Sequence, residues 1–120
     1  MPTVKKPASE ESKCDALVRQ LGGQVVQFGQ KNKRARNTIG VPDRLYFVKG
    51  HVWWFEVKTD DDRLSSQQIL FLTLLSAHGQ FVGVGNRNDL CTLLNAPHPT
   101  NVLPSQITKY STRQKALRGA

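Results

Sequence analysis

The sequence predicts a single mixed α/β domain in which a mixed central sheet is flanked by helices, with the element order αβββαβα and an αβββαβ core. Three observations support this fold class. The 120 residues are the size of one compact domain. Segments with apolar residues at helical spacing alternate with short runs of β-branched and aromatic residues. The first three strands follow one another, whereas the fourth follows a helix, so a hairpin-type sheet gains a strand through a crossover.

The first element is expected to be a helix that begins after Ser9. Ser9 is a favourable N-cap, and Glu10 and Glu11 follow it at the positive end of the helix dipole. Gly22 and Gly23 end this helix. Its apolar stripe consists of Cys14, Leu17, Val18 and Leu21.

Three strands are predicted next, over residues 24–28, 44–48 and 51–59. A Lys-Gly turn at residues 49–50 joins the second strand to the third, and three aspartates at residues 60–62 end the third.

A second helix is predicted to begin after Ser65, with Gln68 at the capping-box position, and to end at residues 78–79. A fourth strand covers residues 81–84, and Asn88 is expected to cap a last helix.

The two ends of the chain are assigned to segments outside the domain, which spans residues 9–95. Residues 1–8 hold two prolines and two lysines and are interpreted as a flexible basic leader. Residues 96–120 contain no acid and few apolar residues, so they are interpreted as a basic C-terminal tail.

The charge of the chain favours a polyanionic partner. The formal net charge is +8, and nucleic acid is the simplest polyanion that would bind such a protein. A basic protein with no nucleic-acid role is the alternative. The two cysteines form no metal-type cluster, and no apolar run is long enough to span a membrane. We therefore expect a cytoplasmic protein that does not bind membranes.

Three ionisable residues fall close together on the predicted second and third strands. Side chains alternate along a strand, so Glu56 and Lys58 point to the same side. Asp43 begins the neighbouring strand, and pairing through the turn at residues 49–50 places it across from Glu56 or Val57. Two converging carboxylates raise each other's pKa unless a cation lies between them. Mg²⁺ prefers such oxygen ligands, so the pattern is consistent with a magnesium site. The alternative to a metal site is a structural Glu56–Lys58 ion pair on the surface of an edge strand.

Three short motifs carry a resemblance to a known nuclease family. GVPDR at residues 40–44, FEVKT at residues 55–59 and RLSSQQ at residues 63–68 together resemble the VRR-NUC branch of the PD-(D/E)XK nucleases. The resemblance covers roughly residues 9–94, and αβββαβ is also the core of that family. It implies a nuclease domain over residues 9–95.

The resemblance also implies roles for individual residues. Asp43 and Glu56 would ligate the metal ion, together with the backbone carbonyl of Val57. Lys58 would be the catalytic lysine. Gln68 would face the site from the second helix.

The family also has a glutamate on its first helix, and Glu10 and Glu11 compete for this role. Counted back from residues 22–23, Glu11 fits the family spacing better, whereas Glu10 aligns with the apolar stripe. We therefore expect Glu11 to join the catalytic set and to reach the metal through water. The family often has a glycine shortly after its E-x-K motif, where this chain has the aspartates at residues 60–62.

Basic residues beside the motifs are expected to contact DNA phosphates, which position a backbone without reading bases. A solvated basic loop is the alternative. Trp53 and Trp54 could stack on a base, although adjacent tryptophans on a strand more often pack in a core or an interface. The expected DNA-binding residues are Lys31, Lys33, Arg34, Arg36 and Arg44.

The function that the resemblance implies is hydrolysis of DNA phosphodiester bonds with Mg²⁺, or with Mn²⁺ as the alternative ion. The expected enzyme is a structure-selective endonuclease that acts as a homodimer on branched DNA such as a Holliday junction. A phage-encoded enzyme would work in the host cytoplasm. A catalytically inactive DNA-binding module of the same fold is one alternative, and a restriction-type enzyme is another.

Overall fold

The computed structural model describes residues 8–28 and 40–119. The element order confirms the predicted αβββαβα and adds two elements after it. The elements are α1 (Glu10–Gln20), β1 (Gln24–Gln27), β2 (Arg44–Val48), β3 (His51–Val57), α2 (Ser66–Ala77), β4 (Phe81–Gly85), α3 (Arg87–Asn95), the 3₁₀ turn η2 (Pro99–Asn101) and α4 (Leu103–Gly119).

The four strands form one mixed sheet in the order β1-β2-β3-β4. β1, β2 and β3 pair antiparallel, while β4 pairs parallel to β3 because α2 carries the chain back across the sheet. Lys49 and Gly50 both have positive φ, at 55° and 78°, as a tight two-residue hairpin turn requires. This turn fixes the register that pairs Val48 with His51 and Arg44 with Phe55.

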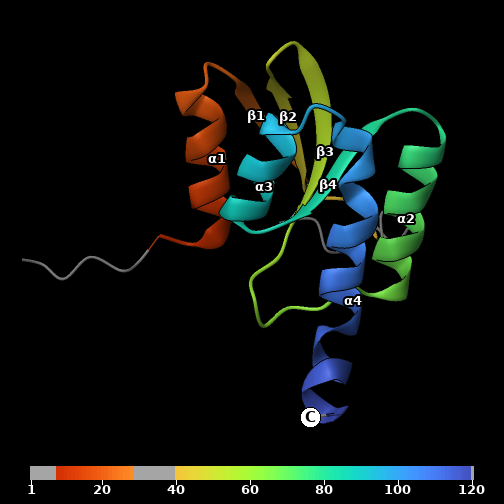
Figure 1. Ribbon diagram of the computed structural model, residues 1–120. Helices are drawn as coiled ribbons and strands as arrows, with labels where there is room; N and C mark the ends of the chain where they lie inside the picture. The colour runs from red at the N-terminus through yellow and green to blue at the C-terminus, as the bar shows by residue number, and fades with distance from the viewer. Residues whose placement is uncertain (1–7, 29–39, 120) are drawn as a thin grey trace, which may run out of the picture.

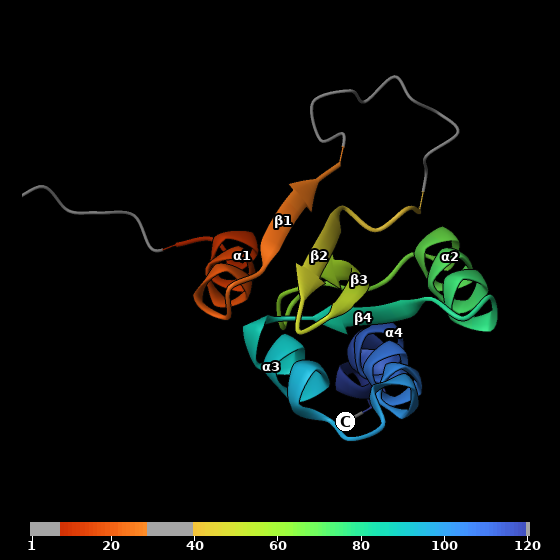
Figure 2. The same ribbon diagram turned by 90° about the horizontal axis from the view of Figure 1, so that it is seen from above.

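Helices cover both faces of the sheet, with α1 and α3 on one face and α2 and α4 on the other (Figure 1). Seen from above, α1 lies beside β1 and α2 beside β4 at the opposite edge (Figure 2). The core under α1 and α3 contains Cys14, Leu17, Val18, Tyr46, Val48, Trp53, Phe55, Val57, Leu90, Leu93 and Leu94. The core under α2 and α4 contains Leu64, Leu72, Val82, Val84, Leu103 and Tyr110.

The C-terminal segment differs from the predicted basic tail. Residues 103–119 form α4, and its Leu103 and Tyr110 are buried in the second core. Gln106 of the same helix accepts a hydrogen bond from the backbone of Val84, and the carbonyl of Tyr110 accepts one from Leu64. Leu103, Ile107 and Tyr110 are spaced four and three residues apart and pack into the same core, so a segment with few apolar residues can still form a packed helix.

Smaller corrections concern element ends. The N-cap of α3 is Asn86, which forms a capping box with Asp89, and not Asn88. β1 ends one residue and β3 two residues before the predicted ends. Residues 1–7 of the predicted leader lie outside the described residues. Within residues 8–28 and 40–119, no helix is both long and apolar enough to cross a membrane.

Candidate active site

Asp43 and Glu56 lie side by side at one end of the β2–β3 hairpin. Arg44 pairs with Phe55, so the same register carried one residue further places Asp43 opposite Glu56. Both side chains are mostly enclosed, with exposed fractions of 18% for Asp43 and 8% for Glu56. The sequence prediction that these two carboxylates converge therefore agrees with the geometry.

A close contact at Gly40 holds the turn before Asp43 against α2. Gly40 has a φ of 89°, and a Cβ added there would lie 2.6 Å from the backbone oxygen of Gln67. Pro42, which follows two residues later, is fully buried. Because only glycine combines this φ with this approach, the GVPD segment seats Asp43 next to the first turn of α2.

Gln68 connects that first turn to Glu56. It occupies the N3 position of α2, where its Oε1 accepts a hydrogen bond of 2.9 Å from the backbone N–H of Ser65. Its Nε2 donates a hydrogen bond of 3.1 Å to Glu56 Oε2. The capping box thus holds the Gln68 side-chain amide by its oxygen, so that its nitrogen orients the buried Glu56 carboxylate.

Lys58 completes the group on the same side of β3. Its Nζ lies 3.9 Å from Glu56 Oε2 and donates a hydrogen bond of 3.3 Å to the carbonyl of Arg63. The side chain is 13% exposed and therefore mostly enclosed, so its ammonium group is held beside Glu56. Val57 lies between Glu56 and Lys58 and buries its side chain on the opposite face of the sheet.

The electrostatics of the site favour an added positive charge. Burial and, to a lesser extent, the nearby charge of Asp43 raise the pKa of Glu56 to about 8, although Lys58 acts to lower it. Burial also raises the pKa of Asp43; Arg44 lowers it and Glu11 raises it. Two carboxylates are therefore held together in surroundings that disfavour their ionised forms.

The structure separates the two glutamates of α1. Glu10 Oε2 accepts a hydrogen bond of 2.7 Å from the backbone N–H of Arg87, at the first turn of α3. Glu11 instead acts electrostatically on Asp43. Glu10 thus has a place in the packing of two helices, whereas Glu11 is the glutamate whose charge reaches the candidate site.

Arg44 does not occupy the predicted DNA-facing position. Arg44 is only 5% exposed, and its Nε donates a hydrogen bond of 2.9 Å to Asp15 Oδ1. The same oxygen accepts a hydrogen bond of 2.8 Å from the hydroxyl of Tyr46, and Gln27 donates to Asp15 Oδ2. Arg44 is a buried structural residue because it neutralises Asp15. The other predicted DNA contacts, Lys31, Lys33, Arg34 and Arg36, lie outside the described residues.

An aromatic pair that the sequence did not reveal flanks the site. Trp54 packs against the second core, as expected for one of two adjacent tryptophans. Its ring also stacks on Phe28, with centroids 5.7 Å apart. Phe28 was assigned only to the end of a strand, because no local pattern indicates which ring will meet it across the sheet.

The donor set suits an oxygen-preferring cation. In the part of the chain that the structure describes, no group of three or more His, Cys, Asp or Glu side chains is arranged to hold a metal ion. Asp43 and Glu56 would thus act as two carboxylate ligands, with a carbonyl and water for the rest, a set that fits Mg²⁺ better than Zn²⁺.

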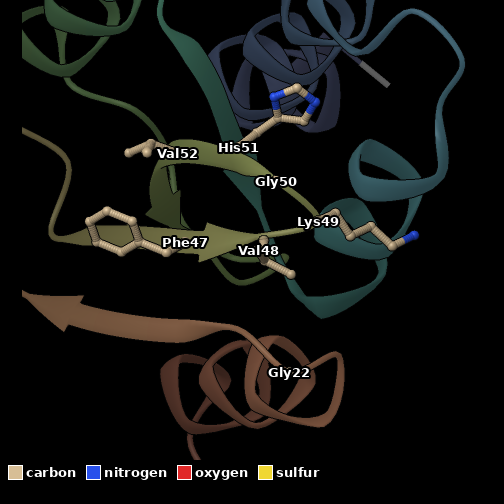
Figure 3. Close-up of a pocket in the computed structure, with 7 residues that line it drawn as sticks. All are labelled: Gly22, Phe47, Val48, Lys49, Gly50, His51 and Val52. Atoms are coloured by element: carbon tan, nitrogen blue, oxygen red, sulfur yellow. The ribbon is translucent and has the colours of Figure 1, made fainter.

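A hollow of about 360 Å³ lies at the far end of the hairpin and is separate from these carboxylates. It is bounded by residues 47–52 and Gly22 (Figure 3). Phe47 and Val52 point to one side of the hairpin and Lys49 to the other (Figure 3). None of its lining residues is an acid, so it offers no carboxylate ligand for a cation.

Comparison with known proteins bears on the fold. No protein-family model matches the sequence, and no curated protein matches it. Among solved structures, a chain described as a VRR_NUC domain is similar, with a TM-score of 0.59 and 20% sequence identity. The similarity covers 72% of this chain and 91% of that chain. The protein therefore has the fold of a VRR_NUC domain, as its three motifs indicated.

Proposed function

We propose that this protein is a Mg²⁺-dependent endonuclease that cleaves branched DNA. The observation that carries the proposal is the grouping of Asp43, Glu56, Lys58 and Gln68 at one end of a sheet with the VRR_NUC fold. Each residue would take the role that its motif implies, and the net charge of +8 suits a polyanionic substrate.

The chain's own residues divide the work of phosphodiester hydrolysis. Lys58 presents a positive charge beside Glu56, where it would stabilise negative charge on a phosphate oxygen or on an attacking hydroxide. Gln68 holds the Glu56 carboxylate in one orientation, so that less reordering is needed on binding. Glu11 adds negative charge near Asp43 and would reach a cation through water.

Asp43 and Glu56 would hold the metal ion, with the Val57 carbonyl as a further oxygen ligand. A divalent ion would offset the repulsion between the two carboxylates and the burial that raises their pKa. Bound there, Mg²⁺ would polarise the phosphate and lower the pKa of a coordinated water. Mn²⁺, which accepts similar ligands, would replace it.

The substrate and assembly form part of the same proposal. A homodimer would place two such sites about a two-fold axis, as symmetric cleavage of a four-way junction requires.

Labelled duplex, flap and four-way DNA incubated with Mg²⁺ test the proposal. We expect cleavage of the branched substrates by the wild-type protein and strongly reduced cleavage by Lys58→Ala and by Asp43→Ala. Lys49→Gln is the matched control, because Lys49 lies at the far end of the hairpin and bonds to the end of α3. Undiminished cleavage by Lys58→Ala would refute the assignment, and the mass of the protein in solution tests the homodimer.

The same experiment separates the second candidate function. A DNA-binding module of the same fold would bind the four-way junction tightly and cleave no substrate with any divalent metal. The presence of both carboxylates and the lysine in one group favours the enzyme.

A further inference from the structure

Phe28 and Trp54 form a stacked aromatic pair next to the candidate site. Their ring centroids are 5.7 Å apart, and their planes differ by 16°. Trp54 and Glu56 are two residues apart on β3, so both project from the same face of the sheet. Phe28 stacks on Trp54 from the neighbouring side and therefore shares this face.

The backbone places Phe28 in line with the two carboxylates. The N–H of Phe28 donates a hydrogen bond of 3.0 Å to the carbonyl of Asp43, so the antiparallel pairing of β1 and β2 continues to this point. Phe28, Asp43 and Glu56 thus occupy one row across three strands. Adjacent strands are about 5 Å apart, which places Phe28 about 10 Å from Glu56 across the sheet. The sugar and base of a nucleotide can bridge such a distance.

Trp54 is held rigidly behind Phe28. Its Nε1 donates a hydrogen bond of 3.2 Å to Gln80 Oε1, and its ring packs against the second core. Phe28 itself is 36% exposed. The pair is therefore a preformed aromatic surface with one fixed ring and one accessible ring, and binding to it would require little reordering.

Another phenylalanine on the same face gives an internal comparison. Phe47, at the hairpin end of β2, is 42% exposed, and it stacks on none of the described aromatic rings. Residues 43 and 47 are four apart, so this second ring lies about 13 Å along the strand from Asp43. Exposure alone does not single out Phe28, whereas its rigid backing and its position beside Asp43 do.

We propose that Phe28, backed by Trp54, stacks on an unpaired nucleobase adjacent to the phosphate bound at the candidate site. The inference rests on the proposed function and specifies the kind of substrate that the site prefers. Every base has a π-face, so an aromatic surface binds bases with little regard to sequence. In a regular duplex the bases are already stacked on one another. The pair therefore favours DNA in which a base is free next to the scissile bond.

Equilibrium binding in Ca²⁺ with labelled DNA tests this inference separately from cleavage. The probes are a duplex with one bulged thymine, the same duplex with an abasic site at the bulge, and the fully paired duplex. The variants are Phe28→Leu, which removes the aromatic ring, Phe28→Tyr, which keeps one, and Phe47→Leu as the matched control.

We expect wild type to bind the thymine bulge about 10-fold more tightly than the abasic bulge. Phe28→Leu should remove this difference, whereas Phe28→Tyr and Phe47→Leu should retain it. Affinity for the paired duplex should be the same for all four proteins.

An unchanged thymine-to-abasic ratio in Phe28→Leu would overturn the inference. Loss of the ratio in Phe47→Leu, or a changed mass of Phe28→Leu in solution, would also overturn it, because the face would then be an interface between copies of the chain. A normal ratio in a wild-type protein that cleaves nothing in Mg²⁺ would refute the proposed function and leave the stacking site standing.

Discussion

Two buried carboxylates on opposite sides of the β2–β3 hairpin are stabilised in different ways. Asp15 receives hydrogen bonds from the Arg44 guanidinium and the Tyr46 hydroxyl, both at less than 3 Å. Glu56 receives one from the neutral amide of Gln68, and the ammonium group of Lys58 is 3.9 Å away. The first carboxylate is neutralised by the protein itself, whereas the second is set beside another acid.

The difference shows how a structural carboxylate can be told from a functional one. Burial raises the pKa of Tyr46, and its hydrogen bond to Asp15 raises it further, so this phenol stays a donor and the network stays closed. Around Glu56, burial and Asp43 act together to raise the pKa. Arg44 lies 4.0 Å from Asp43 and Lys58 lies 3.9 Å from Glu56, yet the pKa of both acids stays raised. A cation bound between the two carboxylates would favour their ionised forms.

The largest expected effect comes from removing Asp15 from its hydrogen-bond network with Arg44 and Tyr46. Asp15→Ala removes the closest acidic partner of the buried Arg44 guanidinium and leaves it only the longer contacts to Asp43, which should lower the free energy of unfolding by about 3–5 kcal/mol. Urea denaturation measures this change, and cleavage per folded molecule should remain near the wild-type value. The double variant Asp15→Ala with Arg44→Met should recover part of the loss. A decrease below about 1 kcal/mol would show that the network contributes little.

The next largest effect concerns the ammonium group of Lys58, which lies beside Glu56 in the candidate active site. Lys58→Met should reduce the cleavage rate by about 10²–10³-fold, because a preorganised positive charge beside the phosphate is lost. Lys58→Arg keeps the charge with different geometry and should retain more activity than Lys58→Met. Single-turnover cleavage assays distinguish the variants, and equal rates for wild type and Lys58→Met would contradict the role of this side chain.

Stability as a function of pH should sharpen the contrast between the two carboxylates. The pKa of Glu56 is about 8 in the folded chain and 4.5 ordinarily, so between these values the folded protein keeps a proton that the unfolded chain has released. The stabilising contribution is complete below about pH 4.5 and is lost as the pH rises through about 8.

Glu56→Gln cannot ionise, so without metal its free energy of unfolding should exceed that of wild type by about 2–4 kcal/mol above pH 8. Near pH 4.5 the two proteins should be about equally stable. Thermal denaturation across this range measures the difference, and Mg²⁺ should raise the Tm of wild type only. Parallel pH profiles for the two proteins would be inconsistent with a buried, titrating Glu56.

The smallest expected effect comes from removing the side chain of Gln68, which makes one hydrogen bond to Ser65 and one to Glu56. Gln68→Ala removes the capping box and should cost about 1 kcal/mol of stability. It also releases the Glu56 carboxylate, so cleavage should fall about 10-fold, near the low end for loss of a positioning contact. Gln67→Ala, one residue earlier on the exposed surface of the same helix turn, is the control and should change neither quantity.

The parts of the site that local sequence determines were predictable. The Lys49-Gly50 turn sets the hairpin register, and alternation along β3 then fixes which residues share a face with Glu56. The position of Gln68 follows from its spacing to Ser65, because a capping box is a local pattern. These three features place the acids, the lysine and the glutamine without any knowledge of distant packing.

Features that depend on contacts between distant segments were not predictable. The sequence indicates DNA contact for Arg44 because its partner, Asp15, lies 29 residues earlier on α1 and no local pattern joins them. It indicates a tail in place of α4 because the buried residues of this helix are sparse and are recognisable only once the second core is formed. The Phe28–Trp54 stack likewise joins the residue after β1 to β3 across the sheet.

The double attachment of Gln68 has a consequence for motion. One end of its amide closes the first turn of α2, and the other end touches Glu56, so neither can shift without disturbing the other. Hydrogen exchange at the amides of that turn should therefore slow when a cation occupies the carboxylates. Slower exchange in α2, a helix that supplies no ligand to the cation, would then indicate that the cation has bound.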